Sequence, residues 1–250
     1  MVIQRMSIAP DNLVAYDVEV DDPRHIPDLV KITQELGAYT PVLIGLDHQE
    51  DCSDRHAMRG RYEDFGGLEP GEDVFRRPDG GKTVYTDDSK YALTFGSPLE
   101  PGDQKRAESY TQALHDFIDE RTHITFQRGK RDLYLGGDQI IGVSQLFGPD
   151  SAVRRAYWAE EVPDIYDIMY RDGASKEEIR THREAMEKSA EVLGEQNFYN
   201  QVMKELRADT VNSTEFLETH VDKPGEEAER LLKEEGRREH GVCFLTRPEE

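Results

Sequence analysis

Short apolar runs that read as β-strands dominate the first part of the chain, and they constrain the fold more than any other feature. They are residues 12–20 and 40–48, followed by the sequences KTVYTD, YALTFGS, ITFQ, DLYL and QIIGVSQLF. Apolar residues at helical spacing predict helices over 25–38 and 101–122. Beyond about residue 170 the chain becomes highly charged and helix-rich. We therefore expect an α+β domain over residues 1–170 and a helical C-terminal appendage over residues 171–250.

Two local signals place individual elements more closely. Ser175 and Glu178 have the spacing of a capping box, which predicts a helix that begins there and ends at Gly194. Gly136 and Gly137 separate two strand-like runs, which is typical of a β-hairpin.

The chain of 250 residues is strongly acidic, with 52 Asp and Glu against 31 Lys and Arg and a formal net charge of -21. The acidic residues are spread along the whole length, which indicates a solvated acidic surface. Nucleic acid is excluded as the expected partner, because binding it requires a basic surface. Such a surface suits the cytoplasm of an organism that accumulates salt, where screening weakens self-repulsion.

Several absences point to the same compartment. Two cysteines, Cys52 and Cys243, cannot form a disulfide framework. The first residues lack the apolar core of a signal peptide, and no apolar run approaches the roughly 20 residues of a membrane helix. We expect a cytoplasmic protein with reduced thiols and no membrane partner.

One short stretch carries an unusual group of cations for so acidic a chain. In RRPDGGK, Arg76, Arg77 and Lys82 surround Gly80 and Gly81. Backbone N–H groups near glycine can approach an anion closely, and arginine adds charge-assisted hydrogen bonds. The spacing of a phosphate-binding P-loop is missing. By itself the stretch is either an ordinary turn or a cradle for an anion.

A second stretch, KRDLYLGGDQIIGVSQ, helps to interpret the turn. Together the two resemble the biotin/lipoate protein ligase superfamily, and specifically the lipoate–protein ligases. An earlier strand, YTPVLIGLDHQ, resembles a third motif of that family, so that the resemblance covers residues 40–146. The matching residues are Ile44, Gly45, Gln49, Arg76, Arg77, Gly80, Gly81, Val84, Asp87, Asp132, Leu133, Leu135, Gly137, Ile140, Gly142 and Ser144.

The resemblance implies a fold and an activity. The fold would be a mixed, mostly antiparallel sheet flanked by helices. The enzymes activate lipoate or octanoate with ATP and Mg²⁺ to an acyl-adenylate and pass the acyl group to a lysine of a lipoyl domain or glycine-cleavage carrier protein. Some relatives transfer octanoate from an acyl carrier without ATP. The residues implied to bind substrate and adenylate are Arg76, Arg77, Gly80, Gly81, Thr83, Asp132, Gly142 and Ser144.

The chain departs from the family pattern at the residues that carry charge. Gln139 stands where the family has its central lysine, so the ammonium that supports the developing negative charge is missing. Loss of one such donor typically costs on the order of 10²–10³ in rate. Lys82 replaces the third glycine of the turn, Thr86 replaces a histidine, and Arg131 replaces an asparagine. Lys82 or Arg131 could supply the missing charge from a new direction, or catalysis could be lost.

Two readings of function follow from these departures. The first is a lipoate–protein ligase-like enzyme in which Lys82 assists Gln139 at the catalytic position. The second is a catalytically impaired paralogue that acts as an acyl- or carrier-binding accessory subunit of a complete ligase. We expect the turn and the strand that begins DQIIG to face one another across a pocket, with Arg76 or Arg77 pointing into it. A Lys82 that enters this pocket would favour the enzyme, and one that points to solvent would favour the scaffold.

Histidine and cysteine residues suggest a third, unrelated possibility. On a helix, His48, Cys52 and His56 would share one face with spacing usable by zinc, although a fourth ligand would be needed. The alternative is a set of polar loop residues around a free thiol, and we expect no metal site. Elsewhere, His115 is expected at the solvent edge of its helix and Trp158 in the core.

Overall fold

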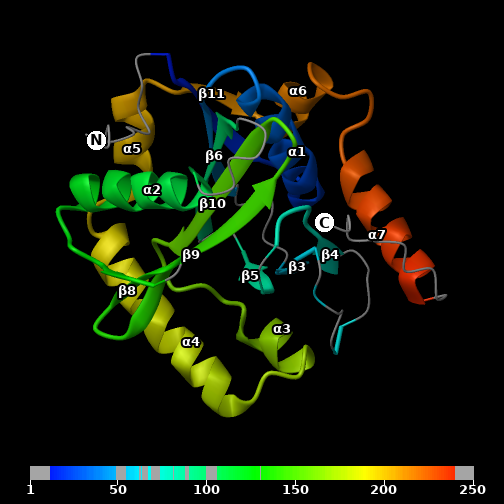
Figure 1. The fold of residues 1–250 in the computed structure, drawn as a ribbon. Coiled ribbons are helices and arrows are strands. Elements are labelled where there is room, and N and C mark those ends of the chain that lie inside the picture. Colours follow the sequence, from blue (N-terminus) through cyan, green and yellow to red (C-terminus); the bar gives the residue numbers. More distant parts are fainter. Residues whose placement is uncertain are drawn as a thin grey trace, which may run out of the picture.

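An eight-stranded sheet forms the centre of the molecule (Figure 1). The computed structural model describes residues 12–48, 55–61, 63, 67–68, 74–80, 82–87, 90–99, 106–129 and 131–239. The order of strands in the sheet is β11-β1-β2-β6-β10-β9-β8-β7. The strands are β1 (Val14–Val20), β2 (Val42–His48), β6 (Lys90–Pro98), β7 (Gln127–Arg128), β8 (Leu133–Leu135), β9 (Asp138–Phe147), β10 (Ser151–Ala159) and β11 (Asp209–Asn212).

Most neighbouring strands of this sheet are antiparallel. Within the described part of this sheet, the parallel pairs are those that β1 forms with β11 and with β2. A smaller sheet has the order β4-β3-β5 and consists of β3 (His56–Arg59), β4 (Val74–Arg76) and β5 (Val84–Thr86). The expected α+β fold with a mixed, mostly antiparallel sheet is therefore confirmed.

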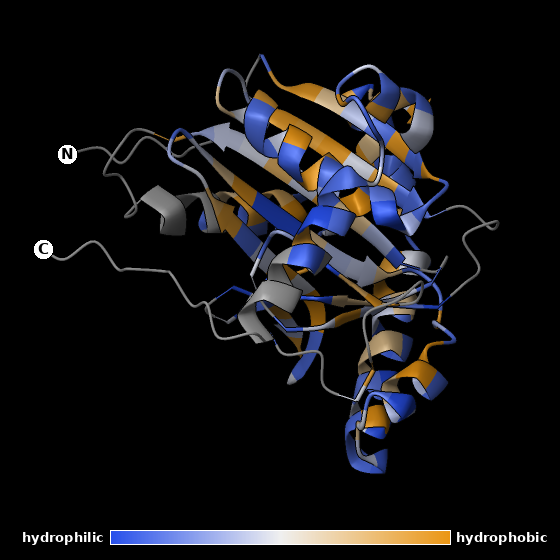
Figure 2. Cartoon of the chain, turned by 90° about the vertical axis from the view of Figure 1, so that its right-hand side faces the viewer, coloured by the Kyte–Doolittle hydropathy of each residue, from blue (hydrophilic) through white to orange (hydrophobic). Residues whose placement is uncertain are grey.

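Helices cover both faces of the main sheet. They are α1 (Ile26–Gly37), α2 (Arg106–Thr122), α3 (Tyr166–Arg171), α4 (Lys176–Ser189), α5 (Phe198–Leu206), α6 (Ser213–Glu218) and α7 (Glu226–Glu239), with a 3-10 turn η1 (Pro23–His25) and a π-helical turn η3 (Ala190–Gly194). Helix α1 lies on one face, and α2 and α5 lie on the other (Figure 1). Hydrophobic and hydrophilic residues are mixed along these helices, as expected where one side of each is buried (Figure 2).

The two faces bury separate apolar clusters. On the α2 and α5 face, Trp158 of β10 packs with Phe198 of α5 and Leu114 of α2. On the α1 face, Val153 of β10 packs with Leu29 of α1. Neighbouring residues of a strand point to opposite faces, so odd positions of β10 face α1 and even positions face α2 and α5. Trp158 is 1% exposed, which confirms its expected place in the core.

The local signals read from the sequence are largely correct. Ser175 and Glu178 form a capping box at the start of α4. Gly136 and Gly137, at φ +63° and +96°, form the turn between β8 and β9. The expectation for His115 was wrong, because it is 2% exposed and its Nε2 contacts a backbone carbonyl.

The segment after residue 170 is helix-rich, and two of its elements are built into the main sheet and core. Strand β11 pairs in parallel with β1 at the edge of the sheet, and α5 contributes four buried residues to the larger apolar cluster. The division of the chain at residue 170 stays a prediction. No helix in the described part of the chain is both long and apolar enough to cross a bilayer.

Candidate functional site

The turn that follows β4 docks on the outer part of the main sheet. The backbone N–H of Gly80 donates a hydrogen bond to the carbonyl oxygen of Gln145 on β9, at 3.1 Å. A side chain at Gly80 would lie 3.9 Å from the same oxygen, so the contact itself is close but not crowded. The turn and β9 therefore lie side by side, as the sequence motifs predict.

A buried polar network fixes this turn against the sheet. Nη1 of Arg77 donates to Asp79 Oδ2 at 2.7 Å and to the hydroxyl of Tyr157 at 3.2 Å. Ser144 of β9 donates to the same carboxylate. On β10, Arg155 donates to the hydroxyl of Tyr157 at 2.6 Å. Burial raises the pKa of Asp79, but Arg77 and Arg155 outweigh it, and the net shift is downward.

Both arginines of the motif are turned into the protein. Nη1 of Arg76 donates to the carbonyl oxygens of Gly60 and Arg61, each at 2.7 Å, and its Nη2 donates to that of Glu63 at 2.6 Å. Nη2 of Arg77 donates to the carbonyl oxygen of Lys82 at 2.6 Å. Arg76 and Arg77 are 3% and 1% exposed. The expectation that one of them points into an open pocket was therefore wrong. The guanidinium group of Arg77 is hydrogen-bonded within the turn, and that of Arg76 to carbonyl groups of the segment after β3.

Gln139 lies on the same face of the sheet as this network. Its Nε2 lies 3.1 Å from the position that a Cβ atom on Gly142 would occupy. Gly142 pairs with Tyr157 and Ser144 pairs with Arg155, so Gly142 and Ser144 share the face of the polar network. Gln139 is exposed, and it is two positions beyond the hairpin turn.

The other proposed site residues are spread around the turn and the β8–β9 hairpin. Asp132 accepts a hydrogen bond from the backbone N–H of Val143, at 2.8 Å, and so joins the loop before β8 to β9. Thr83 accepts from Arg59 at 2.7 Å and donates to Glu63 at 2.9 Å. Gly81 lies outside the described residues.

The two cations considered as replacements for the family lysine are not buried in the polar network. Lys82 and Arg131 are both exposed. An exposed Lys82 is what we expected of a non-catalytic accessory subunit.

The helical arrangement that a zinc site at His48, Cys52 and His56 would need is not formed by the two histidines. His48 ends β2 and His56 begins β3, so they do not share a helical face. Cys52 lies outside the described residues. In the part of the chain that is described, no three His, Cys, Asp or Glu residues are arranged to hold a metal ion.

A buried lysine that sequence reasoning missed lies beside these histidines. Lys90, the first residue of β6, is 7% exposed and donates to the carbonyl oxygen of Tyr85. Burial lowers the pKa of Lys90 to about 8, against the opposing effect of Asp87. Burial lowers the pKa of His48 to about 4, and the charge of Lys90 contributes. The only signal in the sequence was a charged residue at the head of the apolar run YALTF.

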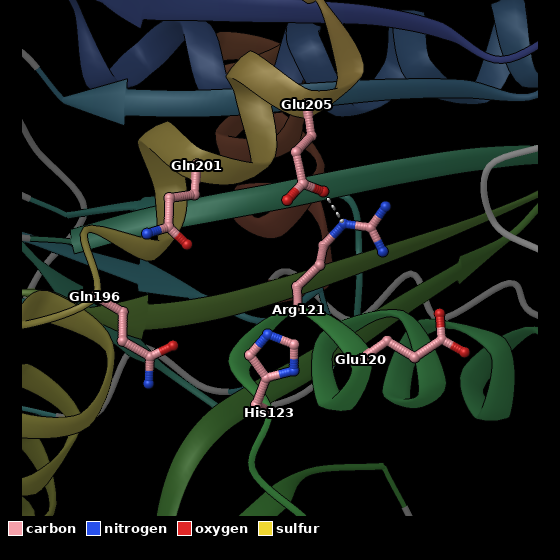
Figure 3. Close-up of a pocket in the computed structure, with 6 residues that line it drawn as sticks. All are labelled: Glu120, Arg121, His123, Gln196, Gln201 and Glu205. Atoms are coloured by element: carbon pink, nitrogen blue, oxygen red, sulfur yellow. Dashed lines mark ion pairs between the residues drawn. The ribbon is translucent and has the colours of Figure 1, made fainter.

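Two solvent-filled hollows lie away from this region. The first, of about 500 Å³, opens between α2 and α5, on the opposite face of the sheet (Figure 3). It is polar, and an ion pair between Arg121 and Glu205 at 3.2 Å crosses it. The second, of about 720 Å³, lies between α1 and α7. Neither is lined by the turn or by β9.

Solved structures share this architecture over nearly the whole chain. A chain from an archaeal lipoylation system of Thermoplasma acidophilum, described as a bi-partite lipoate protein ligase and its E2 lipoyl domain, is 14% identical. The likeness covers 95% of this chain and 98% of that chain, with a TM-score of 0.57. Lipoate-protein ligase A bound with ATP is also 14% identical, over 89% of this chain and 94% of that chain, with a TM-score of 0.50.

Comparisons that use the amino-acid sequence without the structure find no relative. No protein-family model matches the chain, and no curated protein matches it. At 14% identity the structural likeness establishes the fold. The chain thus has the fold of the lipoate–protein ligases, as the three sequence motifs implied.

Proposed function

We propose that this protein acts in protein lipoylation as a lipoate–protein ligase-like protein. It binds lipoate or octanoate and attaches the acyl group to a lysine of a lipoyl domain or a glycine-cleavage carrier protein. The observation that carries the proposal is the agreement in fold, over 95% of the chain, with a chain of the Thermoplasma lipoylation system. The placement of the turn and Gln139 on one face of β9 supports it.

In this proposal the motif arginines do not contact the ligand. They hold in place the backbone and the side chains that form the binding face. Arg77 and Asp79 hold the turn against β9, and Gly80 brings its backbone onto the strand. Gly142 leaves room beneath the amide of Gln139, which can donate a hydrogen bond to an acyl oxygen but carries no charge.

ATP and Mg²⁺ are the cofactors that the resemblance implies, and one of the similar structures is bound to ATP. The described residues of the turn do not fit a triphosphate. The terminal nitrogens of Arg76 and Arg77 are bonded to protein oxygens, and the N–H of Gly80 is bonded to Gln145. We therefore assign these residues no contact with a triphosphate. Transfer to lysine requires an activated acyl group, so we propose that the protein takes the acyl group from an acyl-adenylate or from a thioester of an acyl carrier, with AMP or the carrier thiol as the leaving group.

A second function is favoured by the exposed Gln139 and Lys82. Without a cation at the family position, the protein would bind the acyl group or the carrier domain as an accessory subunit of a complete ligase. The bi-partite ligase of Thermoplasma supports a division of labour between two chains.

One experiment separates the two functions. Purified protein in high salt is incubated with a lipoyl domain and either lipoate or octanoate, with and without ATP and Mg²⁺. Saturable binding of the acid is measured by equilibrium dialysis, and acylation of the lipoyl domain by mass spectrometry. Binding with acylation supports the ligase. Binding without acylation supports the accessory subunit. The absence of binding to either acid contradicts the ligase, and the absence of binding to both the acids and the lipoyl domain contradicts the accessory subunit as well.

The variant Gln139→Lys sharpens this distinction. An impaired scaffold with an intact binding face should gain acylation activity when the ammonium is restored, whereas a compensated enzyme should gain little or lose some. Gln201→Lys is the matched control, since Gln201 is exposed on α5 and the chemical change is the same.

A further inference from the structure

The buried lysine Lys90 lies at the same level of the sheet as Ile140, the residue that follows Gln139 on β9. Lys90 pairs with Ala159 across β6 and β10. Oγ of Ser189 hydrogen-bonds the carbonyl oxygens of both Ala159 and Ile140, at 2.8 and 3.5 Å, which places Ile140 of β9 beside Ala159. Strands lie about 4.8 Å apart, so the backbones of Lys90 and Ile140 are separated by about 10 Å.

The side chain of Lys90 points to the face that Gln139 occupies. Ala159 is an odd position of β10 and shares its face with Tyr157, whose partner is Gly142. Lys90 and Ala159 are paired, so they point to the same side. Gln139 lies over Gly142 on that side. An extended lysine side chain spans roughly half of the separation between the two strands.

Lys90 has hydrogen-bonding capacity to spare. An ammonium group has three donors, and the carbonyl oxygen of Tyr85 accepts one. Among the described residues no acceptor is recorded for the other two. Burying N–H donors without acceptors is unfavourable, so the two remaining donors of Lys90 suit a further acceptor such as a bound carboxylate.

Two further polar atoms at the same place have no partner. Nδ1 of His182 and the hydroxyl of Tyr166 are buried and make no hydrogen bond within the described residues. Their rings lie 6.4 Å apart. Burial lowers the pKa of His182 to about 3, and the charge of Lys90 contributes. One lysine with donors to spare and two polar atoms without a recorded partner thus lie on one face of the sheet, from β6, α3 and α4.

One cation and one anion lie close to Lys90. Arg155 on β10 carries a positive charge, whereas His48 on β2, with a pKa lowered to about 4 mainly by burial, is neutral near pH 7. Asp87, whose carboxylate accepts from the backbone N–H of Asp164 at 2.6 Å, is the anion that acts on Lys90. An added carboxylate would therefore be attracted to this place.

We propose that Lys90 binds the carboxylate head of the acyl substrate and so supplies, from β6, the positive charge that is missing at Gln139. Tyr166 and His182 complete the polar end of the site from α3 and α4. The inference rests on the proposed function, because it assumes that an acyl acid is the ligand, and it assigns the recognition of that acid to residues outside the three sequence motifs.

The test compares an acid with its uncharged amide. Binding of octanoate and octanamide is measured by titration calorimetry for the wild type, Lys90→Gln and Lys204→Gln. Lys204 is an exposed lysine of α5, so it undergoes the same change away from the site. A charge-assisted hydrogen bond contributes about 1.5–3 kcal/mol, so the wild type and Lys204→Gln should prefer octanoate by about tenfold or more. Lys90→Gln should bind the two ligands equally.

A second measurement needs no variant of Lys90. Trace acetylation of the wild-type protein, read by peptide mass spectrometry, reports the reactivity of each lysine. Octanoate should slow acetylation of Lys90 several-fold, octanamide should not, and Lys204 should be unaffected by either.

The outcomes separate this inference from the proposed function. If the wild type binds octanoate but Lys90→Gln keeps its preference for the acid, or octanoate leaves Lys90 equally reactive, the role of Lys90 is wrong and the proposed function stands. If the wild type binds neither lipoate nor octanoate, the proposed function fails and the inference fails with it.

Discussion

At the scale of single residues, acidic side chains lie close together on the α5 face of the sheet. Asp47 of β2 is paired with Glu19 of β1, and Asp17 lies two positions before Glu19 on the same strand. Burial raises the pKa of Asp47 to about 6, and the charges of Asp17, Glu19 and Glu160 add to the shift. Ionised Asp47 therefore lowers the free energy of unfolding.

This cost predicts a pH-dependent effect of Asp47→Asn. The pKa of Asp47 is higher in the folded state than the ordinary value of about 3.9. The folded state therefore takes up the proton first, and this residue lowers stability above pH 6 and ceases to do so as the pH falls toward 4. We expect Asp47→Asn to raise the free energy of unfolding by on the order of 1 kcal/mol at pH 7.5, after screening by solvent, and by less at pH 5.

Urea unfolding at the two pH values measures the effect. Asp222→Asn, at an exposed aspartate, is the control for the change in net charge. An equal gain at both pH values, or an equal gain in the control, would contradict the explanation.

At the scale of elements, the close packing of α1 on β6 depends on a glycine. A Cβ atom on Gly96 would lie 2.3 Å from the carbonyl oxygen of Thr33 in α1. Gly37, at the end of α1, lies against the backbone of Gly96 in turn. Helix α1 can therefore approach β6 this closely at Gly96 only because no side chain is present there.

We expect Gly96→Ala to displace α1 and destabilise the protein. Overpacking of this kind typically costs about 1–3 kcal/mol, and backbone atoms cannot rotate away as a side chain can. Chemical denaturation measures the loss. Ser97→Ala, at the next residue, removes a buried hydroxyl that has no partner in the described part of the chain, so its effect should be small. A Gly96→Ala protein as stable as the Ser97→Ala control would show that α1 does not need this contact.

At the scale of the whole molecule, residues far apart in the chain complete one sheet and one core. Tyr16 of β1 is paired with Asp209 of β11, and Tyr199 of α5 donates to Asp17 at 2.6 Å. Phe198 and Tyr199 are both fully buried. The helix-rich C-terminal part thus supplies packing that the first 170 residues lack.

The predicted division at residue 170 can be tested by truncation. We expect a fragment of residues 1–170 to lack a cooperative unfolding transition, because β1 becomes an unpaired edge and the apolar cluster under α5 is opened to water. Circular dichroism during thermal unfolding, compared with the full chain in the same salt, measures this. A sharp transition in the fragment would instead establish residues 1–170 as an independent domain.

The sequence by itself determined the local structure and the family of fold. The capping box at Ser175, the hairpin at Gly136 and the helix over 25–38 depend on short-range periodicity and backbone preference, which neighbouring residues specify. The motifs also placed the turn after β4 beside β9 correctly.

Only the tertiary structure decided how the charged side chains are used. Arg76 and Arg77 bind the protein's own oxygens. Lys90 points to the face of the sheet that Gln139 occupies, although 49 positions separate the two in the sequence. The physical reason is that the role of a charge depends on its burial and its partners. These partners come from strands and helices that are remote in sequence, and their meeting is set by sheet register and packing, which no local pattern records.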